Sequence, residues 1–408
     1  MHDLTVFGAT SFVGQILTRY LAGRHGVGAD LDWAIAGRSR QKLEALRDSL
    51  GTRAKRLPIL LADAGDPSSL HKLCAHSRCI VSTVGPYALY GEPLVAACAG
   101  TGTDYCDLTG EVQWIRRMLD RHEHAAKASG AHIVHCCGFD SIPSDLGVLF
   151  LERQALQRFG EPCTRVKMRV RAMRGGFSGG TVASLMNVIK EATADPALRK
   201  QLANPYALCP ADSVSTTRQP NVSFAEYDPD FEAWAAPFVM SAINTRIVHR
   251  TNALLGGAYG GDFTYDEAVL AGRGLKGRLA AGSMGAGLAG FMTLGALPPT
   301  RWALGKFVLP GPGEGPTPEQ QEKGFFDIRF KGYTRDGRSI TTRVTGDRDP
   351  GYGSTAKMLG EAAVCLARDV DGAATPGGFW TPATIFGERL IGRLEEHAGL
   401  RFEVLEAG

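Results

Sequence analysis

The first 147 residues alternate short apolar runs with segments in which apolar residues recur at helical spacing. Few charges interrupt the apolar runs, as expected for strands that are buried on both faces of a parallel sheet. Strands and helices that alternate in this way are typical of βαβ units, so the pattern predicts an α/β fold with a doubly wound parallel sheet. Six strands are predicted, at residues 4–7, 31–36, 57–61, 79–84, 104–108 and 132–136.

The pattern changes after residue 147. Residues 165–172 alternate apolar side chains with cations, which indicates a strand with one face in water. Residues 326–334 and 339–345 flank an Asp336-Gly337 turn signal and predict an antiparallel hairpin. Pro and Gly gather at residues 310–318, where we expect a surface loop. The second half of the chain is therefore predicted to form an α+β domain.

Residues 279–300 carry no charge and lie between Arg278 and Arg301. Their number would suffice to span a bilayer. Five Gly and five Ala dilute the hydrophobicity of this stretch, however, and Pro298-Pro299 would stop a helix. Three interpretations stay open: a helix that is buried or lies in a dimer interface, a helix in peripheral contact with a membrane, and a true membrane span.

Composition narrows the class of protein. At 408 residues the chain is long enough for two domains. Lys and Arg number 45 against 42 Asp and Glu, and a net charge of +3 predicts no nucleic-acid surface. Nine cysteines without metal-ligand spacing predict reduced, mostly buried thiols and no metal site. The first strand begins almost at once, without a signal-peptide pattern, so we expect a cytoplasmic protein.

A glycine loop follows the first predicted strand and leads into a helix predicted at residues 11–23. Gly8 and Gly14 would let the backbone turn sharply and approach a pyrophosphate, while the helix N-terminus offers N–H groups to it. Ser11 stands where this pattern often has a third glycine, and it could cap the helix. A tight turn without a ligand is the alternative. The candidate cofactor residues of this loop are Gly8, Thr10, Ser11, Phe12, Val13 and Gly14.

The ends of the second and third strands bear on the choice of cofactor. An acid that would bind the ribose hydroxyls of NAD is absent after the second strand, where Arg38 and Ser39 stand. The Arg38 guanidinium matches the 2′-phosphate of NADP and Ser39 could donate a hydrogen bond to it, although Arg38 could also simply be solvated. Asp63 could bind the adenine amino group or cap the next helix near Asp66. These residues predict NADP as the cofactor.

Loops after the fourth and sixth strands would meet at the carboxyl edge of the sheet, where ligands bind. Tyr87 and Tyr90 are candidate proton donors, and the alternative is that either is a packed aromatic with a wet tip. Asp140 is the third catalytic candidate, and its alternative role is to hold a turn or helix cap. The residues expected to border the nicotinamide are Val84, Gly85, Pro86 and Tyr87.

Several motifs resemble those of the saccharopine dehydrogenase-like oxidoreductases, and within them the trans-acting enoyl reductase group known from mycobacterial lipid biosynthesis. They include GATSFVG (8–14), AGRS (36–39), TVGPY (83–87), DYCDLTGE (104–111) and GFDSIPSDLG (138–147). The last is the most specific, since glycine loops occur in many unrelated reductases. The resemblance implies a Rossmann domain at residues 1–147, an α+β domain for substrate and dimerisation at 148–373, and C-terminal helices at 374–408 that return to the first domain.

The same resemblance implies NADPH-dependent reduction of the C=C bond of an enoyl thioester, as a small molecule or held on a polyketide synthase. Saccharopine reductases have a G-x-D-P-G-x-x-H-like run in place of residues 138–145, which argues against saccharopine as the substrate. Two rivals stay open: reduction of an imine or carbonyl, and a lipid-surface protein that keeps the cofactor fold without turnover. Animal relatives associate with membranes through an apolar segment, so residues 279–300 could contact a lipid surface or, alternatively, a second copy in a homodimer.

Overall fold

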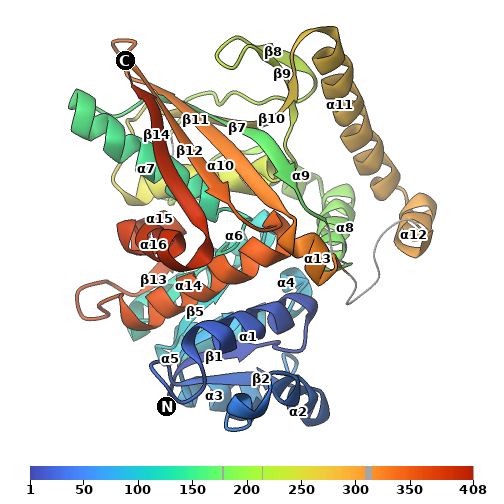
Figure 1. Cartoon of the computed structure of the whole chain (residues 1–408), viewed down its shortest axis with the longest axis vertical. Coiled ribbons are helices and arrows are strands. Elements are labelled where there is room, and N and C mark those ends of the chain that lie inside the picture. Colours follow the sequence, from blue (N-terminus) through green and yellow to red (C-terminus); the bar gives the residue numbers. More distant parts are fainter. Residues whose placement is uncertain (177–178, 214, 308–314, 408) are drawn as a thin grey trace.

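Two seven-stranded sheets, with helices packed on and between them, make up the protein in the computed structural model (Figure 1). The structure describes residues 1–176, 179–213, 215–307 and 315–407. The first sheet is built mostly from the first third of the chain, and the second from the remainder.

The first sheet is parallel throughout and has the order β13-β6-β5-β4-β1-β2-β3. The strand order reverses between β1 and β4, and their carboxyl ends there form the place where α/β sheets bind ligands. All six predicted strands are present, which confirms the doubly wound sheet, whereas the seventh strand was not predicted. The strands are β1 (His2–Phe7), β2 (Trp33–Gly37), β3 (Ile59–Leu61), β4 (Ser77–Ser82), β5 (Asp104–Asp107), β6 (His132–Val134) and β13 (Gly378–Trp380).

Helices cover both faces of this sheet and bury separate apolar clusters. On one face lie α1 (Phe12–His25), α2 (Arg40–Ser49) and α14 (Thr355–Arg368). On the other lie α3 (Pro67–Ala75), α5 (Glu92–Thr101) and α6 (Val112–Ser129). The predicted first helix is confirmed and begins after Ser11, but it runs past Gly23 to a C-cap at Gly26, whose φ of 69° suits glycine.

The second sheet is mixed and has the order β14-β12-β11-β7-β10-β9-β8. The predicted strand at 165–172 and the predicted hairpin are both present. Helices α7 (Ile142–Phe159) and α10 (Ser241–Leu254) pack between this sheet and the first one. The strands are β7 (Arg165–Arg174), β8 (Glu226–Asp228), β9 (Ala233–Pro237), β10 (Thr264–Gly272), β11 (Phe325–Tyr333), β12 (Ser339–Gly346) and β14 (Leu400–Ala407).

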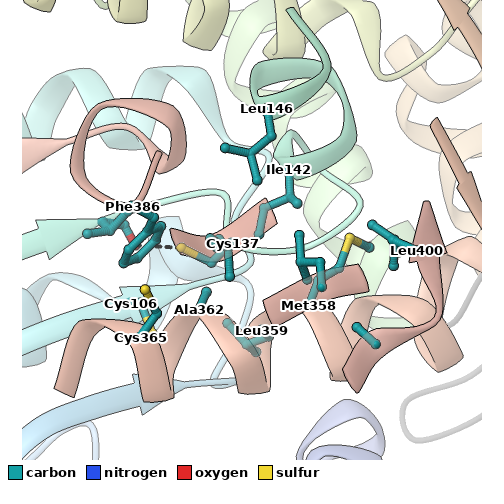
Figure 2. Close-up of a cluster of buried hydrophobic side chains, with 14 of the residues drawn as sticks. Cys106, Cys137, Ile142, Leu146, Met358, Leu359, Ala362, Cys365, Phe386 and Leu400 are labelled. Carbon is teal, nitrogen blue, oxygen red and sulfur yellow. Dashed lines mark hydrogen bonds between the residues drawn. The ribbon is translucent and has the colours of Figure 1, made fainter. Parts of the chain in front are cut away.

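The C-terminal segment differs from its expected course. The chain returns to the first sheet already with α14, ahead of the expected boundary at residue 373. Residues 374–408 then contribute β13 to the first sheet, the short helices α15 (Pro382–Ile385) and α16 (Glu388–Arg393), and finally β14 to the second sheet. Figure 2 shows the resulting core, in which Cys365 of α14 lies near Cys106 and Leu359 lies farther along the same helix. One apolar cluster therefore spans both sheets.

The uncharged stretch forms most of α11 (Gly274–Ala296), which ends just before Pro298-Pro299 as predicted. Small residues line its inner side, since a Cβ on Gly277 would lie 2.1 Å from Gly272 O. Only 17% of its most apolar window is buried, so the interpretation as a buried helix is wrong. Figure 1 shows α11 along the edge of the second sheet beside β8 and β9. Its exposed large apolar side chains are Leu275, Leu279, Met284, Met292 and Leu294.

Three further helices connect these parts: α8 (Gly179–Ala194), α9 (Pro196–Ala203) and α12 (Pro298–Phe307). The loop predicted at 310–318 lies largely outside the described residues, which resume at 315 and enter α13 (Pro318–Glu322). Among the described residues, α11 is the one helix that is long and apolar enough to cross a membrane. The length and composition of a single helix are weak evidence that it spans a membrane.

Candidate active site

The glycine loop forms a cradle at the switch point of the first sheet. Gly8 has a φ of 83°, and a Cβ there would lie 2.7 Å from Val84 Cγ2. A Cβ on Gly14 would lie 2.2 Å from Gly8 O, so α1 approaches the loop closely only because this residue has no side chain. Because these two glycines have no Cβ atoms, the loop backbone leaves space beside the N-terminus of α1. A dinucleotide pyrophosphate could bind in this space close to the backbone.

Ser11 caps α1, because its Oγ accepts a hydrogen bond of 2.9 Å from Gly14 N. The Thr83 hydroxyl, at the end of β4, lies 2.9 Å from Ser11 Oγ and donates to Gly8 O at 2.9 Å. These bonds tie the two strand ends of the switch point together. The predicted cap is confirmed, whereas Thr83 was not predicted as a site residue.

Segments from the second half of the chain border this loop. The Phe12 ring contacts the Tyr352 ring edge-on at 5.2 Å, and a Cβ on Gly315 would lie 2.4 Å from Phe12 Cζ. The Tyr352 hydroxyl lies 2.9 Å from Thr181 Oγ1 at the start of α8. Asp349 holds the turn before Tyr352 by accepting hydrogen bonds from three backbone N–H groups. Sequence reasoning missed this contact because its partners lie more than 300 residues from Phe12.

The predicted specificity residues lie at the ends of β2 and β3. Arg38 is exposed and makes no hydrogen bond or ion pair with the described part of the chain, which leaves its guanidinium available. Ser39 caps α2, accepting a hydrogen bond from Lys42 N at 3.4 Å. Asp63 is exposed and accepts from Gly65 N at 2.9 Å. The helix-cap alternative for Asp63 is wrong, because Asp66 caps α3.

Tyr87 and Tyr90 are the first and last residues of the short helix α4 (Tyr87–Tyr90), but one is buried and the other is exposed. Tyr87 is 4% exposed, and its hydroxyl donates to Ser82 O at 2.9 Å. Burial raises the pKa of Tyr87 well above its usual value, with the Asp107 carboxylate adding to the shift. This placement favours the packed-aromatic alternative for Tyr87. Tyr90 is 51% exposed.

Glu111 and Asp107 fix the loops around these tyrosines. The buried Glu111 carboxylate accepts hydrogen bonds from Tyr87 N and Ala88 N, at 2.8 and 3.0 Å, and so holds the start of α4. Asp107, fully buried at the end of β5, lies 2.7 Å from His135 Nδ1 and accepts a hydrogen bond from the backbone after β6 at Cys136 N. These bonds lock the β4, β5 and β6 loops at one edge of the sheet.

Asp140 and His135 each have one polar atom without a hydrogen-bond partner at this edge. Asp140 Oδ2 and His135 Nε2 are both buried and unpartnered within the described residues. Burial raises the pKa of Asp140 to about 8, and the negative charge of Asp107 adds to the shift. The side chain is therefore mostly protonated at neutral pH. Asp145, by contrast, accepts from Thr251 Oγ1 and Ala383 N, at 2.6 and 2.8 Å, which is a structural role.

The chain is similar to known proteins along nearly its whole length. A Mycobacterium tuberculosis protein with the provisional name trans-acting enoyl reductase is 40% identical over 403 residues, which cover 96% of this chain and 95% of that protein. A trans-acting enoyl reductase of Mycobacterium ulcerans is 36% identical over 405 residues, covering 97% of this chain and 96% of the relative. The chain belongs to the trans-acting enoyl reductase family.

The family model for the saccharopine dehydrogenase NADP binding domain matches residues 4–134, which include the glycine cradle and the ends of β2 to β5. Residues 4–134 are thus an NADP-binding domain, and the protein is an NADP-dependent oxidoreductase. Saccharopine dehydrogenase (L-Glu forming) from Saccharomyces cerevisiae has a TM-score of 0.56 at 14% identity and covers 100% of both chains, which shows a shared fold. The predicted resemblance and Rossmann fold are confirmed.

Proposed function

We propose that this protein reduces the carbon–carbon double bond of an enoyl thioester, with NADPH as the reductant. The observation that carries the proposal is the cradle between β1 and β4, which a Cβ at Gly8 or Gly14 would fill. Relatives that match the chain over nearly its whole length are named trans-acting enoyl reductases, which supports the enoyl substrate.

Each part of the cofactor has candidate partners at the carboxyl edge of the first sheet. The glycine loop would hold the pyrophosphate at the N-terminus of α1. Its residues are Gly8, Thr10, Ser11, Phe12, Val13 and Gly14. Arg38 and Ser39 would bind the 2′-phosphate, because the free guanidinium offers a fork of donors. Asp63 would meet the adenine. The loop residues Val84, Gly85 and Pro86 would border the nicotinamide, which supplies the hydride when NADPH is bound.

Asp140 is our candidate for the proton donor. Reduction of an enoyl thioester needs a hydride at the β-carbon and a proton at the α-carbon. A carboxyl group that keeps its proton at neutral pH and has a buried, unpartnered oxygen is suited to give that proton. Tyr87 is less suited, because its hydroxyl proton is already donated to Ser82 O. Tyr90 is exposed and would have to approach the substrate from the rim.

A comparison of substrates tests this proposal against its rivals. The purified protein is mixed with NADPH and either a 2-enoyl thioester or pairs of an amino acid and a 2-keto acid. We expect NADPH oxidation with the enoyl thioester alone. Oxidation with the amino-acid pairs alone would support an imine reductase instead. Tight NADPH binding without turnover of any thioester would support the lipid-surface rival.

We further propose that the acyl chain arrives on a separate carrier, such as a polyketide synthase. The names of the relatives, which describe an enoyl reductase that acts in trans, support this partner. A carrier-bound enoyl chain should then have a lower KM than the same chain on a small thiol. Equal KM values would contradict a dedicated carrier.

The exposed surface of α11 is our candidate for contact with the cytoplasmic face of a membrane. It exposes leucine and methionine side chains, and cations flank it at both ends while residues 268–313 contain no acid. Apolar area and basic charge together favour anionic lipid. We expect the protein to float with vesicles that contain anionic lipid. The substitution Leu279→Glu should weaken this flotation. A stable dimer that Leu279→Glu dissociates, without any flotation, would instead assign this surface to a second copy.

A further inference from the structure

Two cysteines on neighbouring helices of the first domain face each other at close range. Cys74 near the end of α3 and Cys98 in α5 have their Sγ atoms 3.8 Å apart. Helices α3 and α5 pack against each other on one face of the first sheet. All nine cysteines are free and buried. A disulfide has an S–S bond of about 2.0 Å, so rotation of the two side chains must close a gap of less than 2 Å.

A cavity lies beside one member of this pair. It has a volume of about 440 Å³ and is lined by Cys74 together with His71, Arg78, Asp104 and His132. The starts of β4, β5 and β6 also line it, so it lies at the amino-terminal edge of the sheet. The glycine cradle is at the opposite edge, after β1. Of the nine cysteines, Cys74 lines this cavity, whereas Cys98 does not.

The surroundings favour the thiolate form at Cys74 alone. A hydrogen bond with Cys98 lowers the pKa of the Cys74 thiol, and further bonds with Thr101 and Thr103 outweigh the effect of its burial. Burial raises the pKa of Cys98 and of the other seven cysteines. The thiolate is the nucleophile in thiol oxidation, so attack is expected to begin at Cys74.

We propose that Cys74 and Cys98 form an oxidative modification site, in which a peroxide entering the cavity converts the two thiols to a disulfide. The Cys74 thiolate attacks one peroxide oxygen, the O–O bond breaks, and the sulfenic acid forms as the other oxygen leaves as water after protonation. The Cys98 sulfur then attacks the sulfenic sulfur, and the S–O bond breaks with release of a second water. Two thiols are oxidised and one peroxide is reduced to two waters.

The modification would cross-link α3 to α5 and leave the nucleotide edge as it is. Cys98 lies six residues into α5, so a helical rise of about 9 Å from Glu92 separates it from the nicotinamide loop before Tyr87. The cross-link also closes a chain loop between residues 74 and 98, which restricts the unfolded state. We therefore expect higher thermal stability in the oxidised protein with unchanged affinity for NADPH.

Mass spectrometry of the full-length protein after hydrogen peroxide treatment tests the proposal. Without reduction, a peptide with Cys74 should be joined to the peptide with Cys98, and the joined mass should be two hydrogens below the sum of the two. Fragmentation on both sides of Cys98, before Cys106 and after Cys79, should place the link at Cys98. We expect the pair to be oxidised about tenfold faster than the other cysteines, and the melting temperature to rise by about 5 °C. Dithiothreitol should reverse both changes.

Two variants make the result decisive. Cys98→Ser should abolish the link and the rise in melting temperature, and leave Cys74 trapped as a sulfenic acid that dimedone labels. Cys209→Ser is the matched control, since Cys209 is also buried but lies near Arg250 and Arg116, and it should keep the link. Oxidation that spares Cys74, or that drives it to a sulfonic acid in the wild type without a link to Cys98, would overturn the proposal.

Discussion

Replacement of Asp140 by Asn should stabilise the protein while it impairs the reaction. The unfolded chain ionises this carboxyl at a pKa near 3.8, whereas burial keeps the folded-state pKa at about 8. Because the folded pKa is the higher one, the wild type loses stability as the pH rises between these values, at about 1.4 kcal/mol per pH unit. Asn has nearly the same shape and does not titrate, so it avoids this loss.

The free-energy difference between the two proteins follows from these pKa values. At pH 4 Asp140→Asn should be more stable by less than about 1 kcal/mol, and at pH 7 by about 4 kcal/mol. Urea unfolding at several pH values, followed by circular dichroism, measures the difference. A stability gain that is the same at pH 4 and pH 7 would refute the reasoning, because it would mean that Asp140 titrates alike in the folded and unfolded chains.

Asp145→Asn is the matched control. Asp145 is buried, and burial raises its pKa to about 7. Both of its carboxylate oxygens accept hydrogen bonds, however, and an amide would lose at least one of them, which costs about 1 to 3 kcal/mol. Its stability gain at pH 7 should therefore be smaller than that of Asp140→Asn.

Four further predictions concern the site. Asp140→Asn should lower kcat by about 10² to 10⁴ with unchanged NADPH affinity, and wild-type kcat should fall above pH 8 as the carboxyl ionises; equal kcat values would rule out Asp140 as the acid. Arg38→Ala should weaken NADPH binding in a fluorescence titration by about 1 to 3 kcal/mol and spare NADH, so equal loss for both would exclude a 2′-phosphate contact. Gly8→Ala should abolish binding of both nucleotides, because its Cβ would meet Val84 at 2.7 Å; an unchanged Kd would contradict the cradle. Tyr87→Phe should reduce stability by about 1 kcal/mol through the lost bond to Ser82 O and leave kcat within about twofold, whereas a hundredfold loss would restore Tyr87 as a proton donor.

The sequence allows the first domain to be predicted in detail because its signals are local. Buried strands show as apolar runs, the helix after β1 begins at a capping Ser11, and the Asp336-Gly337 turn marks the hairpin of β11 and β12. Each signal lies within about ten residues of the element that it specifies. The family resemblance rests on such strings as well, and the full-length relatives confirm it.

The elements that were missed depend on partners distant in sequence. Strand β13 has three residues, too few for a periodic pattern, and pairs with β6 after more than 240 intervening residues. The contact between Phe12 and Tyr352 likewise depends on how the second half of the chain folds back. The composition of residues 279–300 predicted an apolar helix. Composition does not show how much of a helix other parts of the chain will cover, and in the structure most of α11 is left uncovered.

The most direct test of the central claim uses NADPH labelled with deuterium at the transferable hydride position and a 2-enoyl thioester. If the protein is an NADPH-dependent enoyl reductase, the saturated thioester should carry one deuterium at the β-carbon and one proton from the solvent at the α-carbon. An unreduced thioester under conditions in which NADPH is bound, or a saturated product without deuterium at the β-carbon, would contradict the account.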